Sequence, residues 1–429
     1  MEAIVGFIMI IILVVGLLKF RILPITFFAT IPFIAAAVLG FGVTDIFKMT
    51  ALGVIDVLPT AALFVFSITY FGVMSDAGLF DRPVNWLLKH MKSSVFGVLV
   101  ATVMVAIISH LDGSGTTTVM ITVPAMLPIA KKLKVRILPV AFLMTMTVSV
   151  MNLLPWGGPL GRAAVVVGSE TTALWRMVLP VQIFGIALLF VSAFLVAKQE
   201  EKLGYAAQPY EGALNEKADV ANELARPKLF WANLVLTVVV IVLLFIGCPA
   251  FLPFMIGLAI ALPMNYGKEG DRAMTARIKA HAGDVVPMIL TIMGAGIFLG
   301  VLQDAGIIDG IAGAIVSVIP ESLGGALHAI FGVLAIPLSL VLEADSMNLG
   351  ILPFIVQAGQ TYGVSAEASA LAIAIGHNAG IGFCMTNASV YFALGLLGLE
   401  YRDALKYCFL KALAFGTAMV AFGLVVGVL

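Results

Sequence analysis

Leu111-Asp112-Gly113-Ser114-Gly115-Thr116-Thr117-Thr118 is a polar run set inside a long stretch of otherwise apolar sequence. The apolar legs on either side, residues 95–109 and 119–130, are short for a membrane crossing, which takes about 20 residues. Basic residues precede the first leg and follow the second, so the outer ends of both legs are expected on the same, cytoplasmic side. The sequence therefore predicts a re-entrant hairpin over 95–130. Its tip must be buried in protein or line a water-filled cavity.

The composition identifies the class of protein. The chain has 429 residues, of which 61% are hydrophobic and only 11% are charged. A soluble protein cannot bury that much apolar surface, so the chain is predicted to be an all-α polytopic membrane protein. Its three cysteines, Cys248, Cys384 and Cys408, lie far apart and predict neither a metal site nor a disulfide.

Apolar segments of crossing length recur along the chain and predict about ten spans plus two re-entrant hairpins. The second hairpin is expected over 323–361, with its polar tip at Leu342-Glu343-Ala344-Asp345-Ser346-Met347-Asn348. The predicted spans are 4–18, 24–41, 56–75, 137–167, 177–197, 229–247, 249–265, 284–303, 366–398 and 404–428.

The distribution of basic residues predicts the orientation in the membrane. With both termini outside, all of the 24 Lys and Arg residues except Lys48, Arg176 and the intramembrane Arg162 lie on the cytoplasmic side. The opposite orientation would invert this bias, so we expect a multi-pass protein of the cytoplasmic membrane with external termini.

A pattern repeats within the chain. Gly72-Val73-Met74-Ser75-Asp76-Ala77-Gly78-Leu79-Phe80-Asp81 recurs as Gly300-Val301-Leu302-Gln303-Asp304-Ala305-Gly306-Ile307-Ile308-Asp309. Each copy ends a span and precedes a hairpin, a broken span and a closing span, at opposite faces of the membrane. This predicts an inverted-topology repeat, typical of secondary transporters, with halves 1–197 and 229–429 joined by a cytoplasmic linker, 198–228. The simplest role of both glycines is to end a helix.

The predicted span 137–167 is broken at Asn152-Leu153-Leu154-Pro155-Trp156-Gly157-Gly158-Pro159, because two prolines and two glycines cannot hold a regular helix. Arg162 follows the break. An arginine at this depth needs a partner, and its planar group suits a carboxylate. We expect Arg162 to face Asn152 and Asp112 in a substrate site. The alternative is a structural pairing with a local acid such as Glu170 or with a helix C-terminus.

The predicted span 366–398 is expected to break similarly, first at 376–382 and again at 386–389, with Asn387 capping the helix that follows. His377 is either a proton carrier or a buried, hydrogen-bonded histidine. The tips and breaks together supply the predicted substrate-binding residues, which are Ser114, Gly115, Thr116, Thr117, Asn152, Gly157, Gly158, Arg162, Ser346, Asn348, Asn378, Thr386, Asn387 and Ser389.

Acidic side chains outnumber the basic one near these tips and breaks. Asp112, Glu343 and Asp345 stand against Arg162 alone, so a multivalent anion would be repelled unless cations travelled with it. We therefore expect these acids, with His377, to couple cations or protons, and the three acids to contact Mg²⁺ or Ca²⁺. The alternative for Asp112 and Asp345 is helix N-capping.

These motifs resemble the citrate–metal–proton symporter (CitMHS) family of the ion-transporter superfamily over nearly the whole chain. The most specific matches are Tyr70-Phe71-Gly72, Leu111-Asp112-Gly113 and the segment from Asn152 to Ala164, together with the acids of the second tip. The resemblance implies symport of citrate complexed with a divalent metal, an elevator-type mechanism and a homodimer. Residues 383–389 and the His377-Asn378 pair depart from the family pattern.

The sequence therefore predicts a secondary transporter that moves citrate or a metal–citrate complex by alternating access. The alternative is the same fold with a different di- or tricarboxylate or another small anion, coupled to H⁺ or Na⁺. We predict no enzymatic activity, because His110 and Asp112 are the sole pair near a nucleophile–base arrangement and nothing completes it. No cofactor and no nucleic-acid partner are expected. The expected partners are a carboxylate with its cation, and the lipid bilayer.

Overall fold

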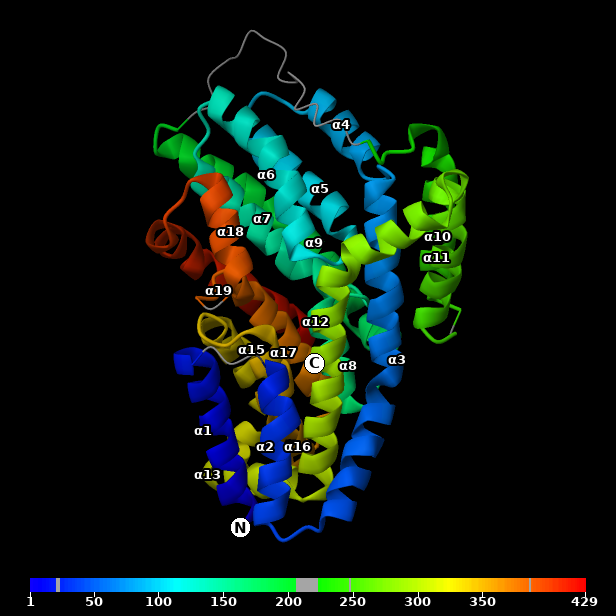
Figure 1. Ribbon diagram of the computed structural model, residues 1–429. Helices are drawn as coiled ribbons and strands as arrows, with labels where there is room; N and C mark the ends of the chain where they lie inside the picture. The colour runs from blue at the N-terminus through cyan, green and yellow to red at the C-terminus, as the bar shows by residue number, and fades with distance from the viewer. Residues whose placement is uncertain (21–23, 206–222, 247, 386) are drawn as a thin grey trace.

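The computed structural model describes residues 1–20, 24–205, 223–246, 248–385 and 387–429, and the regular structure of these residues is all helical (Figure 1). Among them, five helical segments are long and apolar enough to cross a membrane: Val43–Asp76, Val95–Asp112, Thr171–Lys202, Asp271–Asp304 and Tyr401–Val425. Large apolar side chains such as Ile4, Ile183 and Val235 are exposed, as expected for a lipid-facing surface.

Two helices of 34 residues each, α3 and α12, form the centre of one group of helices, here called the frame. They cross at backbone contact: a Cβ on Gly53 would lie 2.1 Å from the carbonyl oxygen of Gly296. Such glycines let membrane helices approach closely. The frame consists of α1 (Glu2–Phe20), α2 (Pro24–Val38), α3 (Val43–Asp76), α10 (Phe230–Leu243), α11 (Phe251–Tyr266), α12 (Asp271–Asp304) and α13 (Ile307–Val318).

A second group of helices, here called the hairpin bundle, holds both predicted hairpins and both broken spans. Its shared core draws buried side chains from both halves of the chain, such as Leu99, Leu189 and Leu371. The bundle consists of α5 (Val95–Ser109), α6 (Gly115–Lys132), α7 (Ile137–Met151), α8 (Gly158–Val167), α9 (Thr171–Lys202), α15 (Leu327–Leu338), α16 (Leu352–Thr361), α17 (Ala366–Ile381), α18 (Ala388–Leu397) and α19 (Tyr401–Val425).

Both predicted hairpins form pairs of helices joined by a short tip. In the first, α5 packs on α6 and the tip contains a short 3₁₀ turn, His110–Asp112. In the second, α15 packs on α16, and the tip ends in a π-helical turn, Ser346–Ile351. The first leg with its turn has the length of a crossing, so length alone does not distinguish a re-entrant leg from a span.

The predicted interruption of 137–167 is confirmed, because α7 ends at Met151 and α8 starts at Gly158. The second predicted break is confirmed only in its later part, because α17 ends at Ile381 and α18 starts at Ala388. The helix α17 continues through Gly376, His377 and Asn378 to Ile381. The reason is packing: a Cβ on Gly376 would lie 1.7 Å from the carbonyl oxygen of Gly332 on α15, so this glycine allows close contact between helices and does not bend the chain.

Both glycines of the repeated pattern end a helix, as predicted. The helices α3 and α12 stop at Asp76 and Asp304, and Gly78 and Gly306 follow with left-handed φ angles of 79° and 68°. Each turn leads into a shorter helix, α4 (Asp81–His90) or α13.

Residues 206–222, most of the predicted linker, lie outside the described part of the chain. The described C-terminal end of the linker is hydrogen-bonded to the turn after α3, because the Arg226 amide donates to the Ala77 carbonyl at 2.9 Å. The Arg226 guanidinium also pairs with Glu269 and lies over the Tyr266 ring.

Candidate functional site

An ion pair joins the two halves of the chain. The Nε of Arg162, on α8, donates to Oδ1 of Asp345, at the second hairpin tip. Both side chains are largely buried, with 11% and 14% of their surfaces exposed. Gly158 makes room for the guanidinium, since a Cβ there would lie 2.6 Å from Nη1. Arg162 therefore does not pair with Glu170, which precedes α9 and is exposed.

Asp345 is free to make this pair because it does not cap a helix. It occupies the residue before the π-helical turn, but its side chain makes no capping hydrogen bond. The capping alternative considered for Asp345 is therefore wrong. Glu343 lies on the same tip, half-buried, and its carbonyl accepts from the Met347 amide at 3.0 Å.

Buried amide and imidazole groups of the second tip and of α17 have unsatisfied atoms. His377 lies within electrostatic reach of Arg162 and Asp345, and its Nε2 is 3.1 Å from the Leu342 carbonyl of the same tip. Within the described residues, His377 Nδ1, Asn348 Oδ1 and both polar atoms of the Asn378 side chain have no hydrogen-bond partner. Buried polar atoms are normally satisfied, so this concentration indicates a place where a ligand or water binds.

At the first tip, Asp112 stabilises the turn itself. Its Oδ1 accepts from the Ser114 amide at 2.8 Å, and Gly113 has a left-handed φ of 76°. Ser114, not Asp112, caps α6 by accepting from the Thr117 amide. The capping alternative therefore fails for Asp112 as well, although its carboxylate has a local structural role. Asp284 and His281 of α12 lie within electrostatic reach of Asp112.

His110 connects the first tip to the first broken span. Its Nδ1 lies 2.7 Å from the Thr118 hydroxyl and its Nε2 lies 3.1 Å from the Asn152 side chain. The Thr118 hydroxyl donates its proton to the Ser114 carbonyl, so Nδ1 must be the donor to Thr118. Asn152 thus meets His110, whereas we expected it to face Asp112 and Arg162.

Trp156 is a structural element that the sequence reasoning did not select. Its indole Nε1 donates to the Leu111 carbonyl at 2.8 Å. Its ring packs against Phe71 and Phe254 of the frame, with centroid distances of 5.2 and 5.4 Å. A tryptophan between Pro155 and Gly157 in a helix break was the available signal, because a polar N–H on a large ring near the membrane centre needs an acceptor.

The remaining predicted residues lie at the two hairpin tips and at the starts of α8 and α18. Gly115, Thr116 and Thr117 form the first turn of α6, and Thr116 is exposed. Gly157 precedes α8, and Ser346 is buried in the π-helical turn. Asn387 caps α18 by accepting from the amide of Ser389, which is exposed, so the predicted N-cap is confirmed. The predicted role of Thr386 falls outside the described residues.

The structure does not bring the three predicted metal-binding acids together. Among the described residues there is no group of three or more His, Cys, Asp or Glu side chains that could hold a metal ion. Asp112 lies at the first tip and Asp345 is paired with Arg162, so in this conformation they do not form one metal site with Glu343. A metal ion would need ligands from elsewhere.

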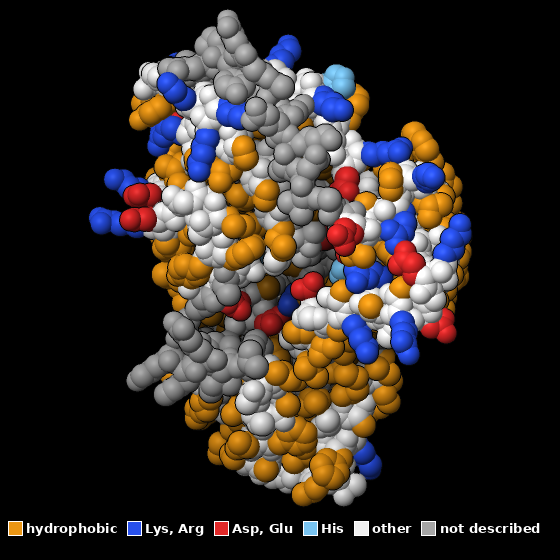
Figure 2. Space-filling view, turned by 45° about the horizontal axis from the view of Figure 1, so that its top comes forward, with side chains coloured by type: hydrophobic (Ala, Val, Ile, Leu, Met, Phe, Trp, Pro, Cys, Tyr) orange, Lys and Arg blue, Asp and Glu red, His pale blue; other side chains and the backbone are white. Residues whose placement is uncertain are grey.

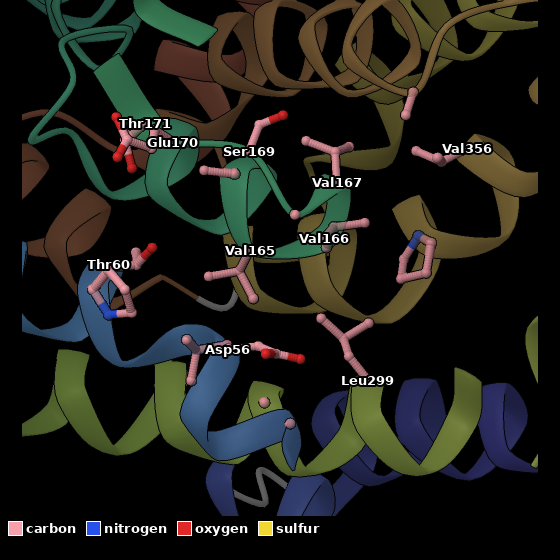
Figure 3. Close-up of a pocket in the computed structure, with 18 of the residues that line it drawn as sticks. Asp56, Thr60, Val165, Val166, Val167, Ser169, Glu170, Thr171, Leu299 and Val356 are labelled. Atoms are coloured by element: carbon pink, nitrogen blue, oxygen red, sulfur yellow. The ribbon is translucent and has the colours of Figure 1, made fainter. Parts of the chain in front are cut away.

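A cavity of about 680 Å³ separates α8 and α16 from the frame helices α3 and α12. Figure 3 shows Asp56 and Thr60 on one wall, with Val165, Val166 and the segment Ser169 to Thr171 opposite. Its carboxylates are Asp56, Glu170 and Asp309, and no Lys or Arg is among the described residues that line it. The wall formed by α8 begins at Ala164, two residues after Arg162.

Residues 4–376 match the family described as citrate transporter. The chain belongs to the citrate transporter family. Members of this family are transporters, so the chain is a transporter and not an enzyme.

Two relatives of this citrate transporter family member come from Bacillus subtilis (strain 168). One is named "Citrate transporter" and is 32% identical over 431 residues, covering 100% of both chains. The other is named "Mg(2+)/citrate complex secondary transporter" and is 33% identical over 430 residues, covering 100% of this chain and 99% of its own.

The fold resembles that of a solved transporter. The crystal structure of the Alcanivorax borkumensis YdaH transporter, described as having an unusual topology, superposes with a TM-score of 0.62 over 90% of this chain and 89% of that one. The sequences are 14% identical, so this similarity concerns the fold alone. It supports the all-helical architecture of this citrate transporter family member.

Proposed function

We propose that this chain is a secondary active transporter that carries citrate complexed with Mg²⁺ or another divalent cation across the cytoplasmic membrane. The observation that carries the proposal is the largely buried Arg162–Asp345 pair, together with unsatisfied amide groups in the same tip and on α17. This arrangement offers a cationic fork for a carboxylate and a carboxylate for a cation within one site. The family and the relative named for a Mg(2+)/citrate complex point to the same substrate.

Different residues of the site would bind different groups of the ligand. Arg162 binds one citrate carboxylate, and the side-chain amides of Asn348 and Asn378 bind the hydroxyl or a second carboxylate. The N-terminus of α8 adds the backbone N–H of Gly158 and a positive helix end, since the Gly157 N–H already donates to the Leu154 carbonyl. The citrate oxygens supply most of the metal ligands, since the described side chains offer no group of three.

The driving cation, H⁺ or Na⁺, acts at the acids and the histidine beside the tips in this proposal. The candidates are Asp112 at the first tip and His377, whose Nδ1 has no partner within the described residues. Uptake driven by an imposed H⁺ gradient, with no response to a Na⁺ gradient, would select the proton.

The two groups of helices are the moving parts in the alternating access that we propose. In our proposal the hairpin bundle slides as an elevator against the frame, in a chain of about ten spans and two re-entrant hairpins. The two halves are inverted repeats, supported by the same order of elements after α3 and after α12: short helix, hairpin, broken span and long helix. The frame would also hold the interface of a homodimer.

The proposed orientation places both termini outside. Lys and Arg side chains gather in the upper part of Figure 2, and hydrophobic side chains cover the lower part. The upper end carries α4, which the proposal places in the cytoplasm (Figure 1).

Counterflow in proteoliposomes tests the substrate. Vesicles preloaded with citrate and Mg²⁺ should accumulate labelled citrate from outside, and succinate or malate should compete at least about ten-fold more weakly. If another di- or tricarboxylate competed as strongly as citrate, that compound would also be a substrate and the preference for citrate would be wrong. No counterflow with any carboxylate would overturn it.

A further inference from the structure

The Arg162–Asp345 pair is made by two segments that meet only in the folded chain, since the residues are 183 positions apart. Both partners retain some exposure, 11% and 14%, so the pair borders accessible space and is not sealed in the core. In the described part of the chain, Nε is the guanidinium nitrogen that makes a hydrogen bond, and its acceptor is Asp345. The terminal nitrogens remain for another acceptor.

Neither citrate alone nor a divalent cation alone fits this arrangement well. A bare citrate trianion that takes Arg162 leaves the Asp345 carboxylate unpaired beside three negative charges. A bare Mg²⁺ that takes Asp345 leaves Arg162 unpaired beside a doubly charged cation. Either ligand breaks an ion pair in a low-dielectric site and leaves one charge without a partner, which is the costly outcome.

The complex of citrate with a divalent cation leaves neither Arg162 nor Asp345 unpaired. It presents free carboxylate oxygens for Arg162 and a coordinated metal ion with an open position for Asp345. We propose that the Arg162–Asp345 pair is a selectivity element that exchanges partners: it opens for a ligand that brings an anionic group and a cation together. This inference rests on the proposed function and assigns the selection of complexed over bare citrate to these two residues.

The cavity next to α8 favours the same form of the ligand. Its described lining contains the carboxylates of Asp56, Glu170 and Asp309 without a compensating Lys or Arg. A trianion is repelled by this lining, whereas the 1:1 complex with a divalent cation carries about one negative charge and is repelled much less. One side of the cavity is formed by Val165, Val166 and Val167 of α8 (Figure 3), the helix that also carries Arg162.

The test measures equilibrium binding to the purified full-length protein in metal-free buffer, with citrate alone, Mg²⁺ alone and both together. The wild type should bind citrate at least about ten-fold more tightly when Mg²⁺ is present. In Asp345→Asn the ratio of citrate affinities with and without Mg²⁺ should fall close to one. The complex loses a ligand to its metal ion, and bare citrate no longer meets an unpaired carboxylate. Asp345→Glu should retain a preference for the complex.

Arg162→Gln gives an independent readout. This variant should bind the complex more weakly than the wild type but should still bind citrate more tightly with Mg²⁺ than without it, because Asp345 still meets the metal ion. The matched control is Glu321→Gln, the same change of carboxylate to amide at an exposed position on α14 (Glu321–Gly324), which should leave the citrate ratio unchanged.

The outcomes separate this inference from the proposed function. A wild type that binds citrate equally well with and without Mg²⁺ overturns the exchange but leaves citrate as the substrate. An unchanged ratio in Asp345→Asn, or a ratio close to one in Arg162→Gln, also overturns it. A wild type that binds citrate in no form overturns the proposed function and this inference together.

Discussion

Trp156 donates its indole N–H to the Leu111 carbonyl at 2.8 Å, and this bond ties the first broken span to the first hairpin tip. The same ring packs against Phe71 and Phe254, so one side chain connects the tip of the hairpin bundle with the frame. Gly113 at the tip allows this approach, since a Cβ there would lie 3.1 Å from the indole. Any movement of the bundle along the frame must rearrange this contact.

The Trp156→Phe variant tests this contact. The aromatic packing is retained but the Leu111 carbonyl loses its donor, which should cost about 1–3 kcal/mol if the carbonyl stays buried. We expect a moderate fall in unfolding temperature and weaker binding of the Mg²⁺–citrate complex. Trp156→Ala should cost more, about 3–5 kcal/mol, because it also leaves a cavity.

The control for that prediction is Trp86→Phe on α4, where the ring is 61% exposed. It should leave both the unfolding temperature and ligand binding unchanged. If Trp156→Phe behaves like Trp86→Phe, the indole hydrogen bond does not position the tip.

The Arg162–Asp345 pair should show strong energetic coupling. Arg162→Gln or Asp345→Asn alone leaves a largely buried charge unpaired and should destabilise the protein by about 3–5 kcal/mol. The double variant removes both charges, so its loss should be clearly smaller than the sum of the single losses. Chemical unfolding of the four proteins in detergent measures this, and additive losses would mean that the two side chains do not interact.

The crossing of α15 and α17 depends on Gly376. The Gly376→Ala variant places a methyl group into the Gly332 carbonyl, so we expect a loss of stability of at least about 1–3 kcal/mol. The control is Gly313→Ala on α13, where no atom lies within 4 Å and alanine should stabilise the helix by up to about 1 kcal/mol. Thermal unfolding decides between them, and equal tolerance at both sites would contradict the close crossing.

The proposed orientation is open to a labelling test. In a Cys248→Ala background, Glu321→Cys and Lys268→Cys place single thiols at exposed positions on proposed opposite faces. The native Cys384 and Cys408 are buried. A membrane-impermeant maleimide added to intact cells should label the position-321 variant and not the position-268 variant. The reverse pattern would invert the topology.

The sequence was sufficient to predict the class of fold, the two tips and the first break, because these depend on local signals. Asn152 to Pro159 must interrupt a helix wherever it packs, and Gly78 and Gly306 end helices for local reasons. The break predicted at Gly376 was misplaced, since a glycine serves equally for bending and for close contact, and only the neighbouring α15 reveals which applies.

The composition of the site was predictable, but its pairing was not. Arg162 was identified as an intramembrane charge in need of a partner, yet its partner Asp345 lies far away in the sequence, whereas the alternative partner Glu170 lies close to it. Likewise, His110 meets Asn152 through tertiary packing that no spacing encodes. The sequence places Trp156 in a helix break but does not show its acceptor. The Leu111 carbonyl reaches the indole only because of the way the tip folds back.

The most direct test of the central claim is to measure citrate and divalent-cation uptake in the same proteoliposomes. Labelled citrate and labelled Ca²⁺ or Mg²⁺ should enter together in an initial ratio of about one, and each should depend on the presence of the other. Citrate that enters at an undiminished rate without any divalent cation, or with no accompanying metal, would contradict the account.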